Sequence, residues 1–327
     1  MPELTYVEAL NEALHEEMAR DEKVFLMGED VAFDYFGVCS GLADRFGRDR
    51  VRDTPICELG FTGAGVGAAM AGFRPIVDLR FMDFTTYALD PIVNQAAKLR
   101  YMLGGQLSVP MVARIPSGAG LQYGATHGQS LEAWFMQVPG LKVLYPSCAP
   151  DAKGLLKAAV RDDNPVMFIE HRLLYAQKTK QSVPEGDHTT PIGVADVKRV
   201  GVDATIVGIG YQMGHCLEAA EALAVEGIEC EVIDPLSLSP LDVETITASV
   251  RKTSRCVIVE EGHLRSGVGA EISAAIQEAV FEYLDAPIGR VAALMAPIPV
   301  QTKLEKFVLP STEKVIAAVR KTLGVAA

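Results

Sequence analysis

The sequence predicts an α/β protein built from two open, mostly parallel sheets that are flanked by helices. Short apolar runs alternate with amphipathic helical patterns along the 327 residues, as expected for strand–helix–strand crossover units. This alternation lapses between Lys178 and Pro191, where the chain is polar and contains two prolines. Such a segment is typical of a linker, so we expect two domains, residues 1–190 and 191–327.

The first domain is expected to begin with a helix from Leu4 to Arg20, because apolar residues recur there every three or four positions. A strand at 24–27 follows. The glycine-dense run from Gly60 to Gly72 predicts a helix that packs closely against its neighbours. The remaining alternation predicts strands at 76–79, 109–113, 142–144 and 166–169, and helices at 85–102, 130–137 and 150–161.

The second domain repeats this alternation without a short-period repeat or a low-complexity tract. Its apolar runs predict a second, mainly parallel sheet. The expected strands are 204–208, 230–233, 255–259 and 289–294, and the expected helices are 212–225, 242–250, 268–281 and 311–322.

Charge and composition exclude several classes of function. A formal net charge of −12 repels polyanions, which argues against nucleic-acid binding and favours a basic protein partner. No apolar stretch approaches the roughly 18 residues that span a bilayer, and the first segment is acidic and amphipathic, so we expect no membrane anchor and no export. The six cysteines are scattered without a C-x-x-C pair, which favours a reducing cytoplasm over a disulfide framework or a zinc site.

Two glycine motifs resemble parts of a dinucleotide-binding fingerprint. The G-x-G-x-G motif at residues 63–67 has the wrong spacing, so close helix packing is the better interpretation. The G-x-G-x-x-x-G motif at residues 208–214 lies between a predicted strand and a predicted helix. This motif leaves an NAD- or flavin-binding subunit as an alternative function. No G-x-S-x-G elbow, Walker A loop or H-E-x-x-H helix occurs, which disfavours hydrolases, NTPases and zinc proteases.

Three polar residues are candidates for chemistry. Glu58 precedes the glycine-rich helix in the apolar segment PICELGF, where burial favours a protonated carboxyl that could serve a ring nitrogen. An acid at this position equally suits the helix dipole. Glu29 follows the first strand, and the carboxyl ends of parallel strands border the ligand crevice in open α/β sheets. His127 lies in a glycine-rich loop before a helix, a usual setting for an acid/base histidine.

Nine short segments, in order along the chain, form a more specific pattern. They are GEDV (28–31), DTPICELGF (53–61), VGAAMAGFRP (66–75), NQAAK (94–98), PGLKV (139–143), DAKGLL (151–156), RDDNP (161–165), VIDP (232–235) and SVRKT (249–253). Together they resemble the β chain of thiamine-diphosphate-dependent 2-oxo acid dehydrogenases, from about residue 4 to 322. The resemblance implies a pyrimidine-binding domain followed by a transketolase-type C-terminal domain.

The resemblance implies roles for individual residues. Glu58 matches the glutamate that bonds a pyrimidine nitrogen of thiamine, which promotes the imino tautomer needed to deprotonate the thiazolium carbon. Glu29 is expected near the same cofactor, and Leu59 and Phe84 match positions that flank or stack on the pyrimidine. His127 matches a histidine implied in proton transfer and in passing the acyl group to lipoyl. The next residue here is glycine, where the family often has serine.

The resemblance also implies metal sites. The G-D-G and distant Asn with which thiamine enzymes hold Mg²⁺ and diphosphate do not occur in this chain, so an α subunit is expected to supply them in an α2β2 heterotetramer. A structural K⁺ site is implied as well, built largely from backbone oxygens, which suit a hard cation. The aligned positions are Met111, Ala159, Val160, Asp162 and Asn164.

We therefore expect the β subunit of an oxidoreductase that decarboxylates a small 2-oxo acid and transfers the acyl group to the lipoyl group of a dihydrolipoyl acyltransferase. A basic segment of that acyltransferase would suit the acidic C-terminal domain. Acetoin dehydrogenase is the alternative within the family, and the chain lacks the insertion after GEDV that often marks it. Alternatives of another class are the nucleotide-binding subunit and a noncatalytic interaction subunit.

Overall fold

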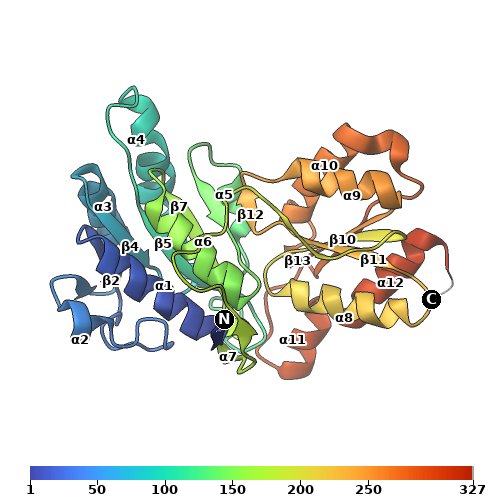
Figure 1. The fold of residues 1–327 in the computed structure, drawn as a ribbon, viewed down its shortest axis with the longest axis horizontal. Coiled ribbons are helices and arrows are strands. Elements are labelled where there is room, and N and C mark those ends of the chain that lie inside the picture. Colours follow the sequence, from blue (N-terminus) through green and yellow to red (C-terminus); the bar gives the residue numbers. More distant parts are fainter. Residues whose placement is uncertain (326–327) are drawn as a thin grey trace. The chain divides into compact units, whose positions relative to one another are not determined.

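The computed structural model describes residues 1–325, which form two compact units. Unit 1 comprises Met1–Ser117 and Trp134–Ile192, and unit 2 comprises Gly118–Ala133 and the residues from Gly193 onward. Each unit is an open sheet with helices on both faces (Figure 1), which confirms the predicted α/β class. Among the described residues, no helix is both long and apolar enough to cross a membrane.

The sheet of unit 1 has the order β6-β7-β5-β4-β2-β3, and all of these neighbours are parallel. The central strands β4, β5 and β7 are buried along almost their whole length because helices cover both faces of the sheet. β3 was not predicted, since its three residues VRD include one apolar side chain. The strands are β2 (Val24–Gly28), β3 (Val51–Asp53), β4 (Arg74–Asp78), β5 (Val112–Ser117), β6 (Lys142–Leu144) and β7 (Val166–His171), beside a separate antiparallel pair of β1 (Glu3–Leu4) and β8 (Gln181–Ser182).

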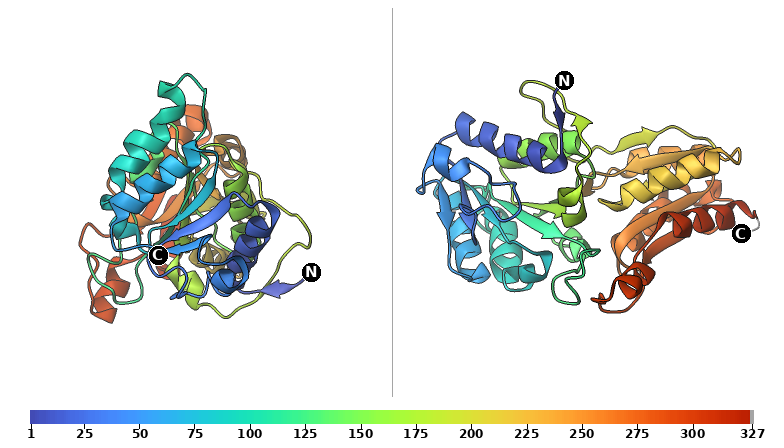
Figure 2. Two further views of the ribbon diagram at one scale, coloured as in Figure 1. Left: turned by 90° about the vertical axis from the view of Figure 1, so that its left-hand side faces the viewer. Right: turned by 90° about the horizontal axis from the view of Figure 1, so that it is seen from below.

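Helices α1 (Tyr6–Arg20) and α6 (Ala149–Arg161) lie side by side on one face of this sheet, and α3 (Glu58–Met70) and α4 (Ala97–Met102) cover the other (Figure 2). α1 begins with a capping box, in which Thr5 and the carboxylate of Glu8 each accept from the other's backbone N–H. The short helices α2 (Leu42–Phe46), α5 (Glu132–Met136) and α7 (Arg172–Ala176) lie in connections.

The single helix predicted for residues 85–102 is wrong in detail. The chain instead forms a 3₁₀ turn η1 (Met82–Thr86), a π-helical segment η2 (Asp90–Ala96) and then α4. Pro91 lies at the start of η2. Proline has no N–H to donate, so a helix that ran through this position would lose a hydrogen bond, and a new segment begins there.

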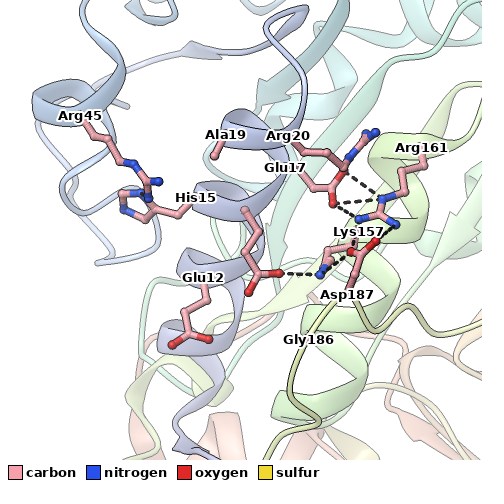
Figure 3. Close-up of a pocket in the computed structure, with 11 residues that line it drawn as sticks. Glu12, His15, Glu17, Ala19, Arg20, Arg45, Lys157, Arg161, Gly186 and Asp187 are labelled. Carbon is pink, nitrogen blue, oxygen red and sulfur yellow. Dashed lines mark hydrogen bonds and ion pairs between the residues drawn. The ribbon is translucent and has the colours of Figure 1, made fainter.

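A hollow of about 730 Å³ beside α1 and α6 is lined mainly by charged side chains (Figure 3). Glu17 is buried on α1 and accepts from Nε of Arg161 at 3.0 Å. Lys157, buried on α6, pairs with Glu16 at 2.5 Å and with Asp187 at 3.0 Å. These charges neutralise one another. The ion pairs connect α1 with α6, and the hollow holds no excess positive charge for an anionic ligand.

The sheet of unit 2 has the order β14-β13-β10-β11-β9. All neighbours are parallel except β9, which is antiparallel to β11. The sheet is therefore mostly parallel, as predicted, and β9 is an addition that its polar sequence DVKR did not indicate. The strands are β9 (Asp196–Arg199), β10 (Ala204–Gly208), β11 (Cys230–Asp234), β13 (Cys256–His263) and β14 (Gly289–Ala293), with a further short strand β12 (Ser237–Ser239).

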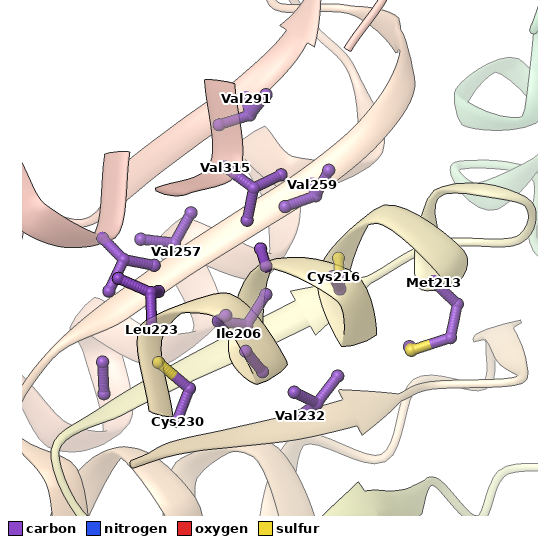
Figure 4. Close-up of a cluster of buried hydrophobic side chains, with 14 residues drawn as sticks. Ile206, Met213, Cys216, Leu223, Cys230, Val232, Val257, Val259, Val291 and Val315 are labelled. Atoms are coloured by element: carbon purple, nitrogen blue, oxygen red, sulfur yellow. The ribbon is translucent and has the colours of Figure 1, made fainter. Parts of the chain in front are cut away.

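Helices α8 (Gln212–Ala224) and α12 (Thr312–Leu323) cover one face of this sheet, and α9 (Val243–Thr253) and α10 (Val268–Val280) cover the other (Figure 1). A 3₁₀ turn η3 (Phe281–Tyr283) follows α10. The core beneath α8 is aliphatic, with side chains from four strands facing two helices (Figure 4). Its buried members include Ile206, Val232, Val257, Val259, Met213, Cys216, Leu223 and Val315.

A buried arginine joins three strands of unit 1. Arg114 on β5 donates to Asp78 on β4 at 2.9 Å and to both carboxylate oxygens of Glu170 on β7 at 2.7 and 2.6 Å. The hydroxyl of Tyr175 also donates to Glu170. Burial by itself lowers the pKa of Arg114, but the charges of Glu170 and Asp78 outweigh it and hold that pKa well above its ordinary value. The guanidinium is therefore charged and fully paired inside the sheet.

Replacing this arginine tests how far unit 1 depends on it. We expect Arg114→Leu to lower the free energy of unfolding by about 3–5 kcal/mol, because two carboxylates stay buried without their partner. Urea unfolding measures the effect. The matched control is Arg251→Leu on the exposed side of α9, where the ion pair with Glu244 at 3.9 Å contributes about 0–1 kcal/mol. Equal losses in the two variants would contradict the assignment.

Candidate active site

The carboxyl ends of three neighbouring strands of unit 1 meet at one edge of the sheet. Gly28, the last residue of β2, is in register with Asp53 of β3 and with Asp78 of β4. Glu29 directly follows β2, and Glu58 begins the helix that follows β3. The fold therefore places both predicted carboxylates at the edge where open α/β sheets bind their ligands.

Close backbone contact positions Glu29. A Cβ atom added at Gly28 would lie 2.5 Å from the carbonyl oxygen of Asp78. Only glycine leaves room for β2 and β4 to approach this closely at their ends. The glycine of the GED segment therefore fixes where Glu29 leaves the sheet.

Glu29 and Glu58 are both buried and interact electrostatically. Burial raises the pKa of Glu29, the charge of Glu58 raises it further, and Arg80 opposes both. Within the described residues, Oε1 of Glu29 is buried and has no hydrogen-bond partner. An unsatisfied buried acceptor costs about 1–3 kcal/mol. A ligand that offers an N–H or O–H donor would recover this cost.

Arg80 holds the backbone beside these carboxylates. Its guanidinium donates to the carbonyl oxygen of Glu29 and lies 3.7 Å from the carboxylate of Asp30. Its own backbone N–H donates to Asp78 at 2.9 Å. Its φ of 56° is uncommon for a residue other than glycine. Arg80 was not a predicted site residue, because neither this conformation nor its partner can be recognised from the local sequence.

Apolar side chains lie at the same edge. Leu59 is 54% exposed although it is large and apolar. Phe84, in η1 after β4, is half-buried and packs edge-to-face on Phe81 with ring centroids 5.3 Å apart. Two buried acids with adjoining apolar side chains suit a flat ligand that carries polar nitrogens on its rim.

His127 belongs to a different part of the structure. It lies in the loop between β5 and α5, within the segment Gly118–Ala133 that forms part of unit 2. The predicted boundary near residue 190 places this segment in the first domain, whereas here it packs as part of unit 2. Nδ1 of His127 lies 3.1 Å from the hydroxyl of Thr126, a contact that can orient the imidazole.

The loop leaves little room for a larger residue after His127. A Cβ atom at Gly128 would lie 3.0 Å from the carbonyl oxygen of Gly124 and 3.4 Å from Cγ2 of Ile298. Serine at this position would therefore require the loop to shift by a few tenths of an ångström. The contact of Thr126 with His127 is present without it.

A buried carboxyl lies where this loop enters α5. Glu132 is 1% exposed, and neither of its side-chain oxygens has a hydrogen-bond partner within the described residues. Burial raises the pKa of Glu132 to about 8, and the nearby charges of Glu260 and Glu261 contribute in the same direction. Glu132 is therefore protonated at neutral pH. No local sequence pattern marks Glu132, since its carboxylate neighbours Glu260 and Glu261 are far from it in the sequence.

The oxygens expected to hold K⁺ already accept hydrogen bonds. The carbonyl oxygens of Val160 and Asp162 both accept from Nη1 of Arg74 at 3.0 Å. Oδ1 of Asn164 accepts from Arg100 at 2.8 Å.

The two other carbonyls of this set accept backbone hydrogen bonds. That of Met111 accepts from the N–H of Val166 at 2.9 Å, and that of Ala159 from the N–H of Asp162 at 3.3 Å. A carbonyl oxygen has two lone pairs, so this donor set retains capacity for a hard cation.

One glycine of each motif packs closely against a neighbouring element, whereas Gly63, Gly67 and Gly214 have no atom within 4 Å of an added Cβ. A Cβ atom at Gly65 would lie 2.7 Å from Val77 on β4, which confirms the close-packing interpretation of the first motif. A Cβ atom at Gly208 would lie 2.7 Å from Sγ of Cys216. At Gly208 the missing side chain serves the contact between β10 and α8, so this glycine by itself is no evidence for a bound nucleotide.

Comparisons with known proteins agree with this architecture. Residues 2–178 match the family described as transketolase, pyrimidine binding domain, and residues 193–315 match transketolase, C-terminal domain. A solved structure described as split gene transketolase, inactive beta4 tetramer, matches over the full length of both chains with a TM-score of 0.79 and 25% identity.

Several similar proteins are β subunits of one enzyme component. The mitochondrial pyruvate dehydrogenase E1 component subunit beta of Dictyostelium discoideum is 49% identical over 98% of this chain and 91% of its own length. The subunit beta of Rickettsia felis is 48% identical over 98% of both chains. The mitochondrial subunit beta of Bos taurus is 46% identical over 99% of this chain and 91% of its own length.

The buried carboxyl of Glu132 makes stability depend on pH. Its pKa is higher in the folded chain than the ordinary 4.5, so the folded state holds the extra proton, and stability falls as pH rises from about 4.5 to 8. We expect Glu132→Gln, which mimics the protonated acid, to remove this fall and to stabilise unit 2 by a few kcal/mol at pH 8.5. Thermal unfolding at pH 5 and 8.5 tests this. The exposed Glu278→Gln is the control, and an equal response of both variants would refute the assignment.

Proposed function

The chain belongs to the transketolase-like family of pyruvate dehydrogenase E1 β subunits, and we propose that it catalyses the oxidative decarboxylation of pyruvate or a similarly small 2-oxo acid together with an α subunit. The observation that supports this function at the site is the pair of buried carboxylates Glu29 and Glu58, one of which keeps an unsatisfied oxygen. Sequence identity of 46–49% across the whole chain supports it independently.

The edge of the unit 1 sheet fits the pyrimidine part of thiamine diphosphate. An aminopyrimidine offers N–H donors and a ring-nitrogen acceptor on its rim, and its faces are apolar. Glu29 would accept a hydrogen bond from such a donor, and Glu58 would hold the proton at the ring nitrogen. Leu59 and Phe84 would pack against the faces of the ring. When bound, the cofactor supplies the carbanion chemistry of decarboxylation.

The buried setting of Glu58 explains why a carboxyl is useful there. A carboxyl at the start of α3, shielded from water, can share a proton with a basic ring nitrogen instead of with solvent. Burial and the charge of Glu58 raise the pKa of the neighbouring Glu29, so Glu29 retains a proton more readily than an exposed glutamate. These residues therefore hold a proton at one defined atom of the ligand.

His127 would act in the later part of the reaction, in proton transfer and in passing the acyl group to lipoyl. Its loop is rich in glycine, exposed at Ala125 and Thr126, and orients the imidazole through Thr126. An acyltransferase with a lipoyl group is the expected acceptor. The α subunit would hold Mg²⁺ and the diphosphate in an α2β2 heterotetramer, since this chain carries no G-D-G motif.

Replacing Glu58 tests the central role. In the complex with its α subunit, Glu58→Gln is expected to lower the rate of dye-coupled decarboxylation about 100- to 1,000-fold, as found when one preorganised group is removed. Thiamine diphosphate binding, measured by calorimetry, is expected to weaken far less. Glu244→Gln is the matched control, because Glu244 also lies in the first turn of a helix, α9.

The same assay separates the alternatives when it is run with pyruvate, branched-chain 2-oxo acids and acetoin. Activity with acetoin alone would identify an acetoin dehydrogenase. An unchanged rate in Glu58→Gln would favour a noncatalytic interaction subunit. Tight NAD binding by the isolated chain would favour the nucleotide-binding alternative.

We also propose that the oxygens of Met111, Ala159, Val160, Asp162 and Asn164 hold K⁺. Oxygen donors alone suit such a cation. A cation that binds the folded chain stabilises it by mass action, by about 2.7 kcal/mol at 100 times the dissociation constant. We expect the unfolding midpoint to be several degrees higher in potassium chloride than in choline chloride at equal ionic strength. Equal midpoints in the two salts would refute the K⁺ site.

A further inference from the structure

A buried carboxylate of unit 2 closes the loop that carries His127. Glu261 on β13 is 5% exposed. Its Oε1 accepts from the backbone N–H of Ala119 at 2.7 Å and from the hydroxyl of Ser130 at 3.0 Å. These two donors lie on opposite sides of His127 in the chain, so one carboxylate oxygen joins the two ends of the loop.

A second carboxylate binds the loop backbone farther along. Glu305 on α11 (Thr302–Val308) is 2% exposed. Its Oε1 accepts from the N–H groups of Gly120 at 2.9 Å and Gln122 at 3.2 Å. Both residues have positive φ, 96° and 63°, and alternate backbone N–H groups then point to one side. Such a concave set of N–H groups binds an anion, and here the anion is the carboxylate of Glu305.

Two further features fix these carboxylates. The other oxygen of Glu261 accepts from Nε2 of Gln212 on α8 at 2.9 Å, which orients the carboxylate. Apolar side chains pack the start of the loop against α11. The members of this cluster are Ala119, Ala293, Ile298, Val308 and Leu309.

From this arrangement we propose that Glu261 and Glu305 are positioning residues that hold the loop so that His127 can act in acyl transfer to lipoyl. Neither carboxylate faces the reacting groups; both act through the backbone of the loop. The inference rests on the proposed function, in which His127 serves this step. The acids proposed to act in decarboxylation, Glu29 and Glu58, belong to unit 1. Loss of the carboxylates should therefore affect the acyl transfer step more than decarboxylation.

The experiment compares both half-reactions in the complex with the α subunit. Glu305→Ala and Glu261→Ala are expected to lower the rate of lipoyl acylation about 10- to 100-fold, as misplacement of a catalytic group does. Dye-coupled decarboxylation should stay within about threefold, a change too small to reflect a displaced catalytic group. Hydrogen exchange of the amides of residues 118–131 should become faster. His127→Ala is the reference and should reproduce the same split between half-reactions without faster exchange at Ala119 and Gly120.

Conservative variants distinguish positioning from general destabilisation. Glu305→Gln keeps an acceptor for Gly120 and Gln122 and should retain more acylation than Glu305→Ala. Glu261→Gln keeps an acceptor for Ala119. Its amide nitrogen can donate to Gln212 once the Gln212 amide turns over, which replaces the Nε2 donor of Gln212 by its Oε1, an oxygen without a hydrogen-bond partner among the described residues. We expect this variant to be close to wild type.

Glu231→Ala is the matched control. Glu231 is a buried glutamate on β11 of the same unit, and it accepts from Lys252 and from the N–H of Gly201. Its loss should leave both the loop exchange and the ratio of the half-reactions unchanged.

The outcomes separate failure of the positioning role of Glu261 and Glu305 from failure of the proposed role of His127. Unchanged exchange of the loop in Glu305→Ala, or an equal fall of both half-reactions, would overturn the positioning role. Normal lipoyl acylation in His127→Ala would instead overturn the role of His127 in the proposed function. Faster loop exchange with selective loss of acylation in both alanine variants, but not in Glu231→Ala, would support the inference.

Discussion

The Arg114 guanidinium holds the strands on which the candidate active site is built. Asp78 binds Arg114 through one carboxylate oxygen and the backbone N–H of Arg80 through the other. Arg80 in turn binds the carbonyl group of Glu29, which is buried beside Glu58. A continuous chain of contacts therefore leads from a fully paired charge in the core to a carboxylate with one unsatisfied oxygen. A buried ion network of this kind costs desolvation, and here it fixes the position of the site.

The two units use carboxylates in opposite ways. In unit 1, Oε1 of Glu29 is buried and lacks a partner among the described residues, which is the property expected of a group reserved for a ligand. In unit 2, Glu261 and Glu305 bind backbone N–H groups of the chain itself. Their acceptors are satisfied internally, so they organise a loop instead of binding a ligand. The distinction depends on hydrogen-bond partners and not on residue type.

The fold class and the family rest on different observations. Open α/β sheets host many activities, and a glycine motif after a strand is compatible with several of them. The packing of Cys216 against Gly208 explains that glycine by a contact between a helix and a strand, without a nucleotide. Similarity along the whole chain then identified the family, and the buried pair of Glu29 and Glu58 supports a specific cofactor site within it.

The sequence by itself determined the α/β class, most strands and helices, and the family motif that contains Glu58, because these depend on local apolar periodicity and on short segments. Only the tertiary structure decided the partners of the buried charges. Arg114 meets Asp78 across 36 residues of sequence, and Glu305 meets Gly120 across 185. Such contacts leave no local signal, since each of these residues, whether charged side chain or glycine, is ordinary within its own sequence segment. The same holds for the positive φ of Arg80, which no local sequence pattern indicates.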